Sequence, residues 1–224
     1  YDLRCVYNAH IGTGELHLRP ILNLKLEKDV RIFRELAEET AHLVKRFRGS
    51  LSGEHGDGRL RGEFLPLIIG DINYAMLREI KRTWDPENIF NEGKIFDTPV
   101  MNTSLRYDAG EAVREIETIL DFSTDQGFIR SVEKCSGSGD CRKTVAMGGT
   151  MCPSFQATND EKDSTRALAN ILREMITRSK RDNPFSHIHI YEVMDLWLSC
   201  KACKSECPSY VEMANLKAEF LHHN

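Results

Sequence analysis

The amino-acid sequence predicts an α+β lobe over residues 1–97, followed by a mostly α-helical domain over residues 125–224. A connector over residues 98–124 joins them. Three observations support this division. Alternating and glycine-rich segments fill the first part, helical spacing of apolar residues dominates the last part, and six of the seven cysteines lie in the C-terminal half.

The composition is that of a globular protein. Apolar residues make up 41% and charged residues 29% of the 224 residues. The net charge of −4 argues against a nucleic-acid-binding protein, and the longest apolar run is too short to cross a membrane. Because the chain opens at Tyr1 within a strand pattern and stops at Asn224 within a helical one, we expect it to be an internal piece of a longer polypeptide.

The N-terminal segment predicts a strand that leads into a turn. Residues 1–8 alternate between apolar and polar, and the sequence HIGTGELH follows them. A Gly-Thr-Gly turn would reset the strand parity, so that His10 and His17 point to the same side. Two imidazoles and a carboxylate can bind a divalent metal. A purely structural histidine pair remains the alternative.

A long helix, a return strand and a second helix are expected next. Apolar residues recur at helical spacing over residues 30–47, and Gly49 is a typical helix stop. The glycine-rich segment around Glu54 and His55 permits close backbone approach to a ligand, with a carboxylate ligand beside an imidazole base. The second helix spans residues 72–84. The residues expected to be buried on it are Ile72, Ala75, Met76 and Ile80.

The cysteine spacing predicts iron–sulfur chemistry. Cys200, Cys203 and Cys207-Pro208 match the end of the C-x2-C-x2-C-x3-C-P pattern, with Trp197 in place of the first cysteine. A looser group, Cys135-x5-Cys141-x10-Cys152, also ends in Cys-Pro. Zinc and buried structural thiols are the alternatives, but zinc ribbons favour two C-x2-C pairs and only one is present.

The distribution of these thiols between clusters stays open. In two-cluster ferredoxins the cysteine before proline binds the other cluster. By that rule Cys152 joins Cys200 and Cys203, whereas Cys207 joins Cys135 and Cys141, which leaves three thiols in each set. Either one cluster forms from four of the six thiols, or two clusters are completed by a non-cysteine ligand or an open iron.

The C-terminal half is expected to be helical between its cysteine loops. A short helix is predicted over residues 112–120 of the connector, one begins after the N-cap Ser164, and two more span residues 189–199 and 211–221. Because loops present the cysteines, we expect little continuous core in this half.

Several motifs together resemble a known family. HIGTGELHLRP, SGEHGDGRLRGEFLP and WDPENIFNEGKIFD resemble the C-terminal half of FAD-linked oxidases, the group of D-lactate, glycolate and D-2-hydroxyglutarate dehydrogenases. CSGSGDCRK, GTMCPSF and CKACKSECPSY resemble the α-helical ferredoxin module of its large bacterial members. The resemblance implies a substrate-binding cap lobe, a ferredoxin-type 4Fe-4S domain with one or two clusters, and FAD held mostly by an upstream domain of the full-length protein.

The resemblance also implies roles for individual residues. His10 and His17 correspond to metal ligands of the family's H-x-G-D-G-N-x-H motif, in which Thr13 and Glu15 replace its Asp and Asn. Glu54 corresponds to the third ligand of a divalent cation (Zn, Mn or Fe).

Three further positions follow from the same resemblance. His55 corresponds to the catalytic base, and Arg19 stands where the family has a substrate-contacting Asn. Arg19 can clamp a carboxylate with its guanidinium. Asn91 falls in the N-x-G-K segment near the flavin.

The implied activity is oxidation of a D-2-hydroxy acid, with electrons passing from FAD through the iron–sulfur domain to a protein or quinone acceptor. The expected location is the cytoplasm, and a quinone acceptor leaves open a peripheral association with the inner membrane. The alternative is a zinc-stabilised interaction domain attached to a non-catalytic lobe. A zinc hydrolase is a third interpretation, but the helical H-E-x-x-H arrangement is missing.

Overall fold

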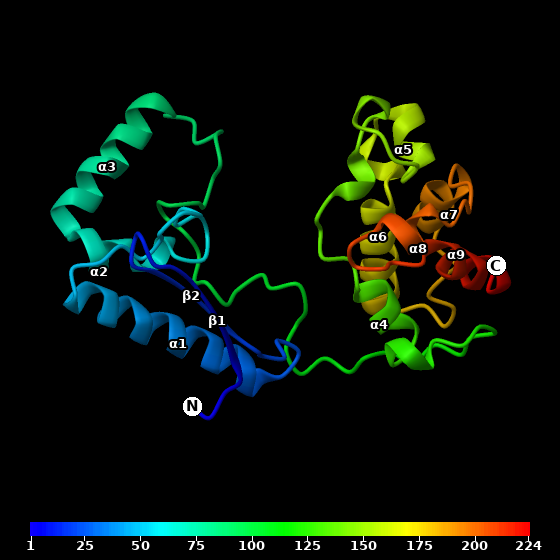
Figure 1. The fold of residues 1–224 in the computed structure, drawn as a ribbon, viewed down its shortest axis with the longest axis horizontal. Coiled ribbons are helices and arrows are strands. Elements are labelled where there is room, and N and C mark those ends of the chain that lie inside the picture. Colours follow the sequence, from blue (N-terminus) through cyan, green and yellow to red (C-terminus); the bar gives the residue numbers. More distant parts are fainter. The chain divides into compact units, whose positions relative to one another are not determined.

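The computed structural model describes all 224 residues, which divide into two compact units, residues 1–111 and 112–224 (Figure 1). The first unit holds a two-stranded sheet and three helices, and the second is helical with short 3-10 turns. The predicted fold class is therefore confirmed. No helix combines the length and apolar composition that a membrane crossing requires.

A β-hairpin opens the first unit. Strands β1 (Cys5–His10) and β2 (Glu15–Pro20) pair antiparallel, with His10 directly opposite Glu15. Gly14 in the turn has φ +71°, in the left-handed region that favours glycine. Directly paired residues lie on the same face of a sheet, so the register places His10 and Glu15 on one side.

Three helices complete the first unit: α1 (Glu27–Arg46), α2 (Leu65–Ile69) and α3 (Asp71–Trp84). The helices predicted over residues 30–47 and 72–84 are thus present as α1 and α3. Helix α1 carries acidic residues in its first turn and basic residues in its last, which complements the helix dipole.

Two expectations for this unit are wrong. The glycine-rich segment is not a return strand, because Gly56 and Gly58 take positive φ values (+74° and +53°) that interrupt an extended chain. Helix α3 does not bury its apolar face: Ile72 is 79% exposed, and Ala75, Met76 and Ile80 are exposed as well. The small buried cluster of this unit includes no residue of α3. That cluster contains Ala41, Phe64 and Met101.

The second unit is built around one long helix. Helix α6 (Thr165–Arg178) packs against α4 (Phe128–Glu133), α7 (Ile188–Asp195) and α9 (Met213–His222) (Figure 1). The two short helices are α5 (Pro153–Thr158) and α8 (Ala202–Glu206).

The helices predicted for this unit are largely confirmed. The predicted N-cap of α6 is present, since Ser164 Oγ accepts a hydrogen bond from the Ala167 N–H at 3.1 Å. The helices expected over residues 189–199 and 211–221 are present as α7, which ends earlier than predicted, and α9.

The expectation of little continuous core in this half is also wrong. Leu168, Leu172 and Ile176 of α6 are fully buried and lie in one contiguous cluster with residues from all the surrounding helices. Five cysteines belong to the same cluster, so the cysteine loops form part of the core and do not interrupt it.

The helix predicted over residues 112–120 is not formed. Instead, the buried Glu219 carboxylate accepts hydrogen bonds from the backbone N–H groups of Ile119 (3.2 Å) and Leu120 (2.6 Å). Arg114 donates to the carbonyl of Arg181 at 2.9 Å. Glu219 thus satisfies backbone N–H groups that a helix would otherwise pair, so tertiary structure overrides the local helical pattern.

Candidate functional site

The hairpin brings both predicted histidine ligands together. Residues alternate sides along a strand, so His17 lies on the same face of β2 as Glu15, and Glu15 pairs with His10. The two imidazole rings have centroids 5.0 Å apart. The turn therefore resets the parity in the way the glycine spacing predicts.

The glycine-rich segment adds a carboxylate to this pair. Glu54 Oε1 lies 3.4 Å from His17 Nε2 and 3.7 Å from His10 Nε2. His55 Nε2 lies 3.1 Å from the same Glu54 oxygen. The three predicted ligands and the predicted base are thus neighbours, although they come from separate parts of the first unit.

Glu15 is a fourth member of the group, which the sequence analysis noted only as a replacement within the motif. Its Oε1 lies 3.7 Å from His17 Nε2. One potential ligand atom from each of His10, Glu15, His17 and Glu54 lies within 4.8 Å of the others. The hairpin register could have revealed Glu15, because a four-residue turn places it opposite His10. These residues can hold a divalent cation with imidazole and carboxylate donors.

The other two predicted site residues of this unit are Arg19 and Asn91. Arg19 is exposed and falls two positions after His17, hence on the same face of β2. Asn91 is exposed, and its Oδ1 accepts a hydrogen bond from Lys94 Nζ at 3.4 Å within its own loop. The roles of both residues stay predictions.

Three of the cysteines line one pocket in the second unit. Cys135 follows α4, Cys141 lies in a 3-10 turn, and Cys207 ends α8. All three line the same small pocket, together with Ser138 and two other serines. Ser138 lies midway in the spacing Cys135-x2-Ser138-x2-Cys141, where a C-x2-C-x2-C pattern would have a thiol. That spacing in the sequence already indicates Ser138 as a neighbour of the two thiols.

The remaining three cysteines are close enough to affect one another. Burial raises the pKa of the Cys203 thiol to about 11, and the charges of Cys152 and Cys200 act in the same direction. The Thr165 hydroxyl opposes this shift. Cys152 and Cys203 are buried, whereas Cys200 is exposed. Cys135, Cys141 and Cys207 thus line one pocket, whereas Cys152 and Cys200 lie near Cys203.

Cys152 has neighbours in both sets. Burial raises the pKa of the Cys141 thiol, and the charges of Cys135 and Cys152 add to that effect. Because Cys152 also influences Cys203, it lies between the two groups.

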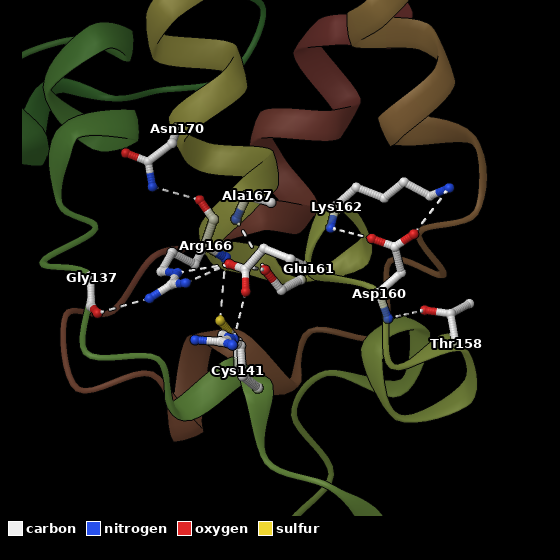
Figure 2. Close-up of polar contacts among 11 residues, drawn as sticks. Gly137, Cys141, Thr158, Asp160, Glu161, Lys162, Arg166, Ala167 and Asn170 are labelled. Atoms are coloured by element: carbon white, nitrogen blue, oxygen red, sulfur yellow. Dashed lines mark hydrogen bonds and ion pairs between the residues drawn. The ribbon is translucent and has the colours of Figure 1, made fainter. Parts of the chain in front are cut away.

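The N-terminus of α6 faces the thiols. The backbone N–H of Arg166 donates to Cys141 Sγ at 3.3 Å, and the Arg166 side chain is held by Glu161 and the carbonyl of Gly137 (Figure 2). Helix N-termini stabilise nearby negative charge. This arrangement suits thiolates that bind a metal or a cluster.

One carboxylate ties the cysteine loops together. Glu206 lies between Cys203 and Cys207 in sequence, and it accepts hydrogen bonds from the backbone N–H groups of Thr150 (3.1 Å) and Met151 (3.0 Å). These amides directly precede Cys152. The same side chain therefore fixes the loop of one Cys-Pro group against that of the other.

The positions of the thiols fit iron–sulfur clusters. Buried sulfurs from distant loops converge beside backbone amides, which is typical of cluster sites. Each set nevertheless holds three thiols. Trp197, at the position of the missing cysteine, is buried and has no metal-binding atom, whereas Ser138 offers a hydroxyl.

Comparison with known proteins identifies both units. Residues 1–95 match the model of the C-terminal domain of FAD linked oxidases, and residues 134–212 match that of the 4Fe-4S dicluster domain. The chain is 29% identical to the D-2-hydroxyglutarate dehydrogenase of Pseudomonas putida, over 99% of this chain and 25% of that protein.

Other relatives are also dehydrogenases or oxidases of 2-hydroxy acids by name. The chain is 27% identical to the D-2-hydroxyglutarate dehydrogenase of Escherichia coli, over 95% of this chain and 24% of the relative. The glycolate oxidase subunit GlcD of Bacillus subtilis is 28% identical over 43% of this chain and 20% of its own length. The chain thus spans about a quarter of the length of the curated relatives that it matches along most of its sequence. No solved structure matches. We conclude that this chain joins a C-terminal domain of the FAD-linked oxidase family to a 4Fe-4S dicluster domain.

Proposed function

We propose that this chain is the metal-binding and electron-transfer part of a FAD-dependent dehydrogenase that oxidises a D-2-hydroxy acid. The observation that carries the proposal is the convergence of His10, His17 and Glu54 beside His55 in a domain of the FAD-linked oxidase family. The names of the relatives make D-2-hydroxyglutarate the first substrate to test, ahead of D-lactate and glycolate.

The group of side chains around Glu54 supplies the substrate-binding chemistry. His10, His17 and Glu54 offer the donor set for a divalent cation, which when bound would lower the pKa of a coordinated hydroxyl. His55 stands beside Glu54, with its Nε2 3.1 Å from the carboxylate, and is 66% exposed at its side chain. Its imidazole is therefore accessible to accept the proton of the substrate hydroxyl.

The substrate carboxylate needs a cationic partner, and the hydride that leaves the substrate needs an acceptor. Arg19 follows His17 on the same strand face, and its guanidinium can bind a carboxylate through two parallel hydrogen bonds. FAD, when bound, accepts the hydride from the substrate α-carbon. We assign Asn91 to the flavin side of the site on the resemblance of its N-x-G-K segment alone.

The second unit carries the electrons onward. We assign Cys135, Cys141 and Cys207 to one cluster, and Cys152, Cys200 and Cys203 to another. The dicluster match and the two sets of thiols support this assignment. Clusters transfer single electrons, so a protein or quinone acceptor suits this arrangement.

Two measurements test the proposal. Anaerobic reconstitution of the 224-residue chain with iron and sulfide should give a brown protein whose visible absorption is bleached by dithionite. A colourless protein that retains zinc would instead support a zinc-stabilised interaction domain. In the full-length protein, D-2-hydroxyglutarate should reduce an electron-accepting dye, whereas the L-enantiomer should not. Absence of turnover with every D-2-hydroxy acid tested would contradict the proposed reaction.

A further inference from the structure

We propose that Glu15 is a fourth protein ligand of the divalent cation, so that the site consists of two imidazoles and two carboxylates. This inference rests on the cation site proposed above and specifies its chemistry. The family motif that the sequence resembles has an Asn at this position, so the additional carboxylate is a feature of this chain.

The hairpin places Glu15 on the same sheet face as both imidazoles. Glu15 is the direct cross-strand partner of His10, and His17 lies two residues further on the same face. Its side chain is 16% exposed, compared with 44% for Glu54. The strand backbone therefore presents the less exposed of the two carboxylates on the face that carries both imidazoles.

The distances fit a shared ion better than they fit direct pairing. Glu15 Oε1 lies 3.7 Å from His17 Nε2, which is too long for a hydrogen bond. Donor atoms that bind one ion at about 2.1 Å lie at most about 4.2 Å apart. The four donor atoms lie within 4.8 Å of one another, so small side-chain movements suffice to bring them onto one ion.

Gly53 provides the space for this carboxylate. A Cβ atom at position 53 would lie 2.3 Å from Glu15 Cδ and 2.4 Å from its Oε1. The glycine-rich segment therefore passes directly against Glu15 before it presents Glu54. Two carboxylates gathered in this way repel each other unless a cation lies between them. The close approach at Gly53 is an observation independent of the ligand geometry.

The extra carboxylate determines which class of cation fits. Four protein ligands would close a tetrahedral zinc site, and catalytic zinc sites keep a position open. A six-coordinate ion with the same four ligands retains two positions, which the hydroxyl and carboxylate of a 2-hydroxy acid can occupy together. Carboxylate oxygens also suit Mn²⁺, whereas imidazoles alone favour zinc or copper. The donor set therefore points to a six-coordinate cation such as Mn²⁺.

Titration of the metal-free 224-residue chain with Mn²⁺, followed by electron paramagnetic resonance, tests the inference without relying on activity. In Glu15→Gln the affinity for Mn²⁺ should fall at least about 10-fold, as it does when even an outer partner of a ligand is lost. Gly53→Ala should weaken binding as well, because its Cβ displaces Glu15. Glu87→Gln, at an exposed glutamate of the same unit, should bind as the unmodified chain does.

Glu15→Asp separates ligation from charge. It keeps the negative charge but shortens the side chain by one methylene, so its affinity should also fall. Equal affinity in Glu15→Gln and the unmodified chain would overturn the inference while leaving the cation site intact, and so would full affinity in Glu15→Asp. If the unmodified chain does not bind Mn²⁺, or if His10→Ala binds it as tightly as the unmodified chain does, the proposed cation site itself is wrong. Circular dichroism of each variant shows whether it remains folded.

Discussion

The Glu206 carboxylate accepts a hydrogen bond from the backbone N–H of Met151 at 3.0 Å, across 55 positions of sequence. Met151 precedes Cys152, and Glu206 precedes Cys207. One side chain outside the thiol sets thus holds the two Cys-Pro segments together. This contact should matter most before any cluster forms, when no iron links the loops.

Replacement of Glu206 should loosen the cysteine loops. In Glu206→Ala the amides of Thr150 and Met151 lose their acceptor, so the iron bound after reconstitution should fall and the apo chain should melt at a lower temperature. Iron analysis and thermal melts followed by circular dichroism measure both effects. Glu115→Ala, at an exposed glutamate of the same unit, is the matched control. Identical iron content in Glu206→Ala and the unmodified chain would contradict this role.

The same contact predicts a pH dependence. Hydrogen bonds from Thr150 and Met151 lower the pKa of Glu206 below its ordinary value of 4.5. A carboxyl group whose pKa is lower in the folded than in the unfolded state stabilises the fold above its unfolded pKa. That contribution should be lost as pH falls below 4.5 through the lowered value. Urea unfolding of the apo chain across this range should show a shallower pH dependence in Glu206→Gln.

Helix α6 should carry much of the stability of the second unit. Leu172 is fully buried at its centre, so Leu172→Ala should lower the free energy of unfolding by about 2–5 kcal/mol. Leu221→Ala, at an exposed position of α9, should change it by less than about 0.5 kcal/mol. Urea denaturation of the apo chain gives both values. A similar loss in the two variants would show that α6 is not the centre of the core.

The grouping of thiols predicts different losses in two cysteine variants. Cys207→Ala should remove the cluster of Cys135 and Cys141, and Cys200→Ala should remove the other, so each should retain about half of the iron. Their electron paramagnetic resonance spectra after reduction should be complementary. Cys5→Ala, in the first unit, should retain all of the iron. Loss of the same signal in both cysteine variants would indicate one shared cluster.

His55 should affect the chemical step rather than cation binding. His55→Gln in the full-length protein removes the proposed base, so kcat should fall about 10²- to 10⁴-fold. Affinity for Mn²⁺ should change little, because His55 is not among the four proposed ligands. Steady-state kinetics with D-2-hydroxyglutarate and a metal titration separate the two effects. An unchanged kcat would assign the proton transfer elsewhere.

The parts of the structure that follow from local pattern were predictable. Helices α1, α3 and α6 follow from apolar spacing, with the Ser164 cap for α6, and the approach of His10 to His17 follows from strand parity and a glycine turn. These features depend on neighbours a few residues apart. The sequence therefore contains enough information to place them.

The features that depend on distant contacts were not predictable in this way. Residues 112–120 have helical spacing, but Glu219, about a hundred positions away, takes their backbone N–H groups. Likewise, the contact of Glu15 with the Gly53 segment depends on where that segment crosses the hairpin. The exposed apolar face of α3 also had the periodicity of a buried one, because periodicity predicts a stripe and not its partner.

The position of Cys152 has a consequence for any attempt to redesign this protein. This thiol raises the pKa of both Cys141 and Cys203, so the two sets of thiols are separated by a single side chain. A substitution at Cys152 should therefore affect both sets of thiols, whereas one at Cys200 or Cys207 should affect a single set. A redesign should therefore keep both sets of thiols together with Cys152.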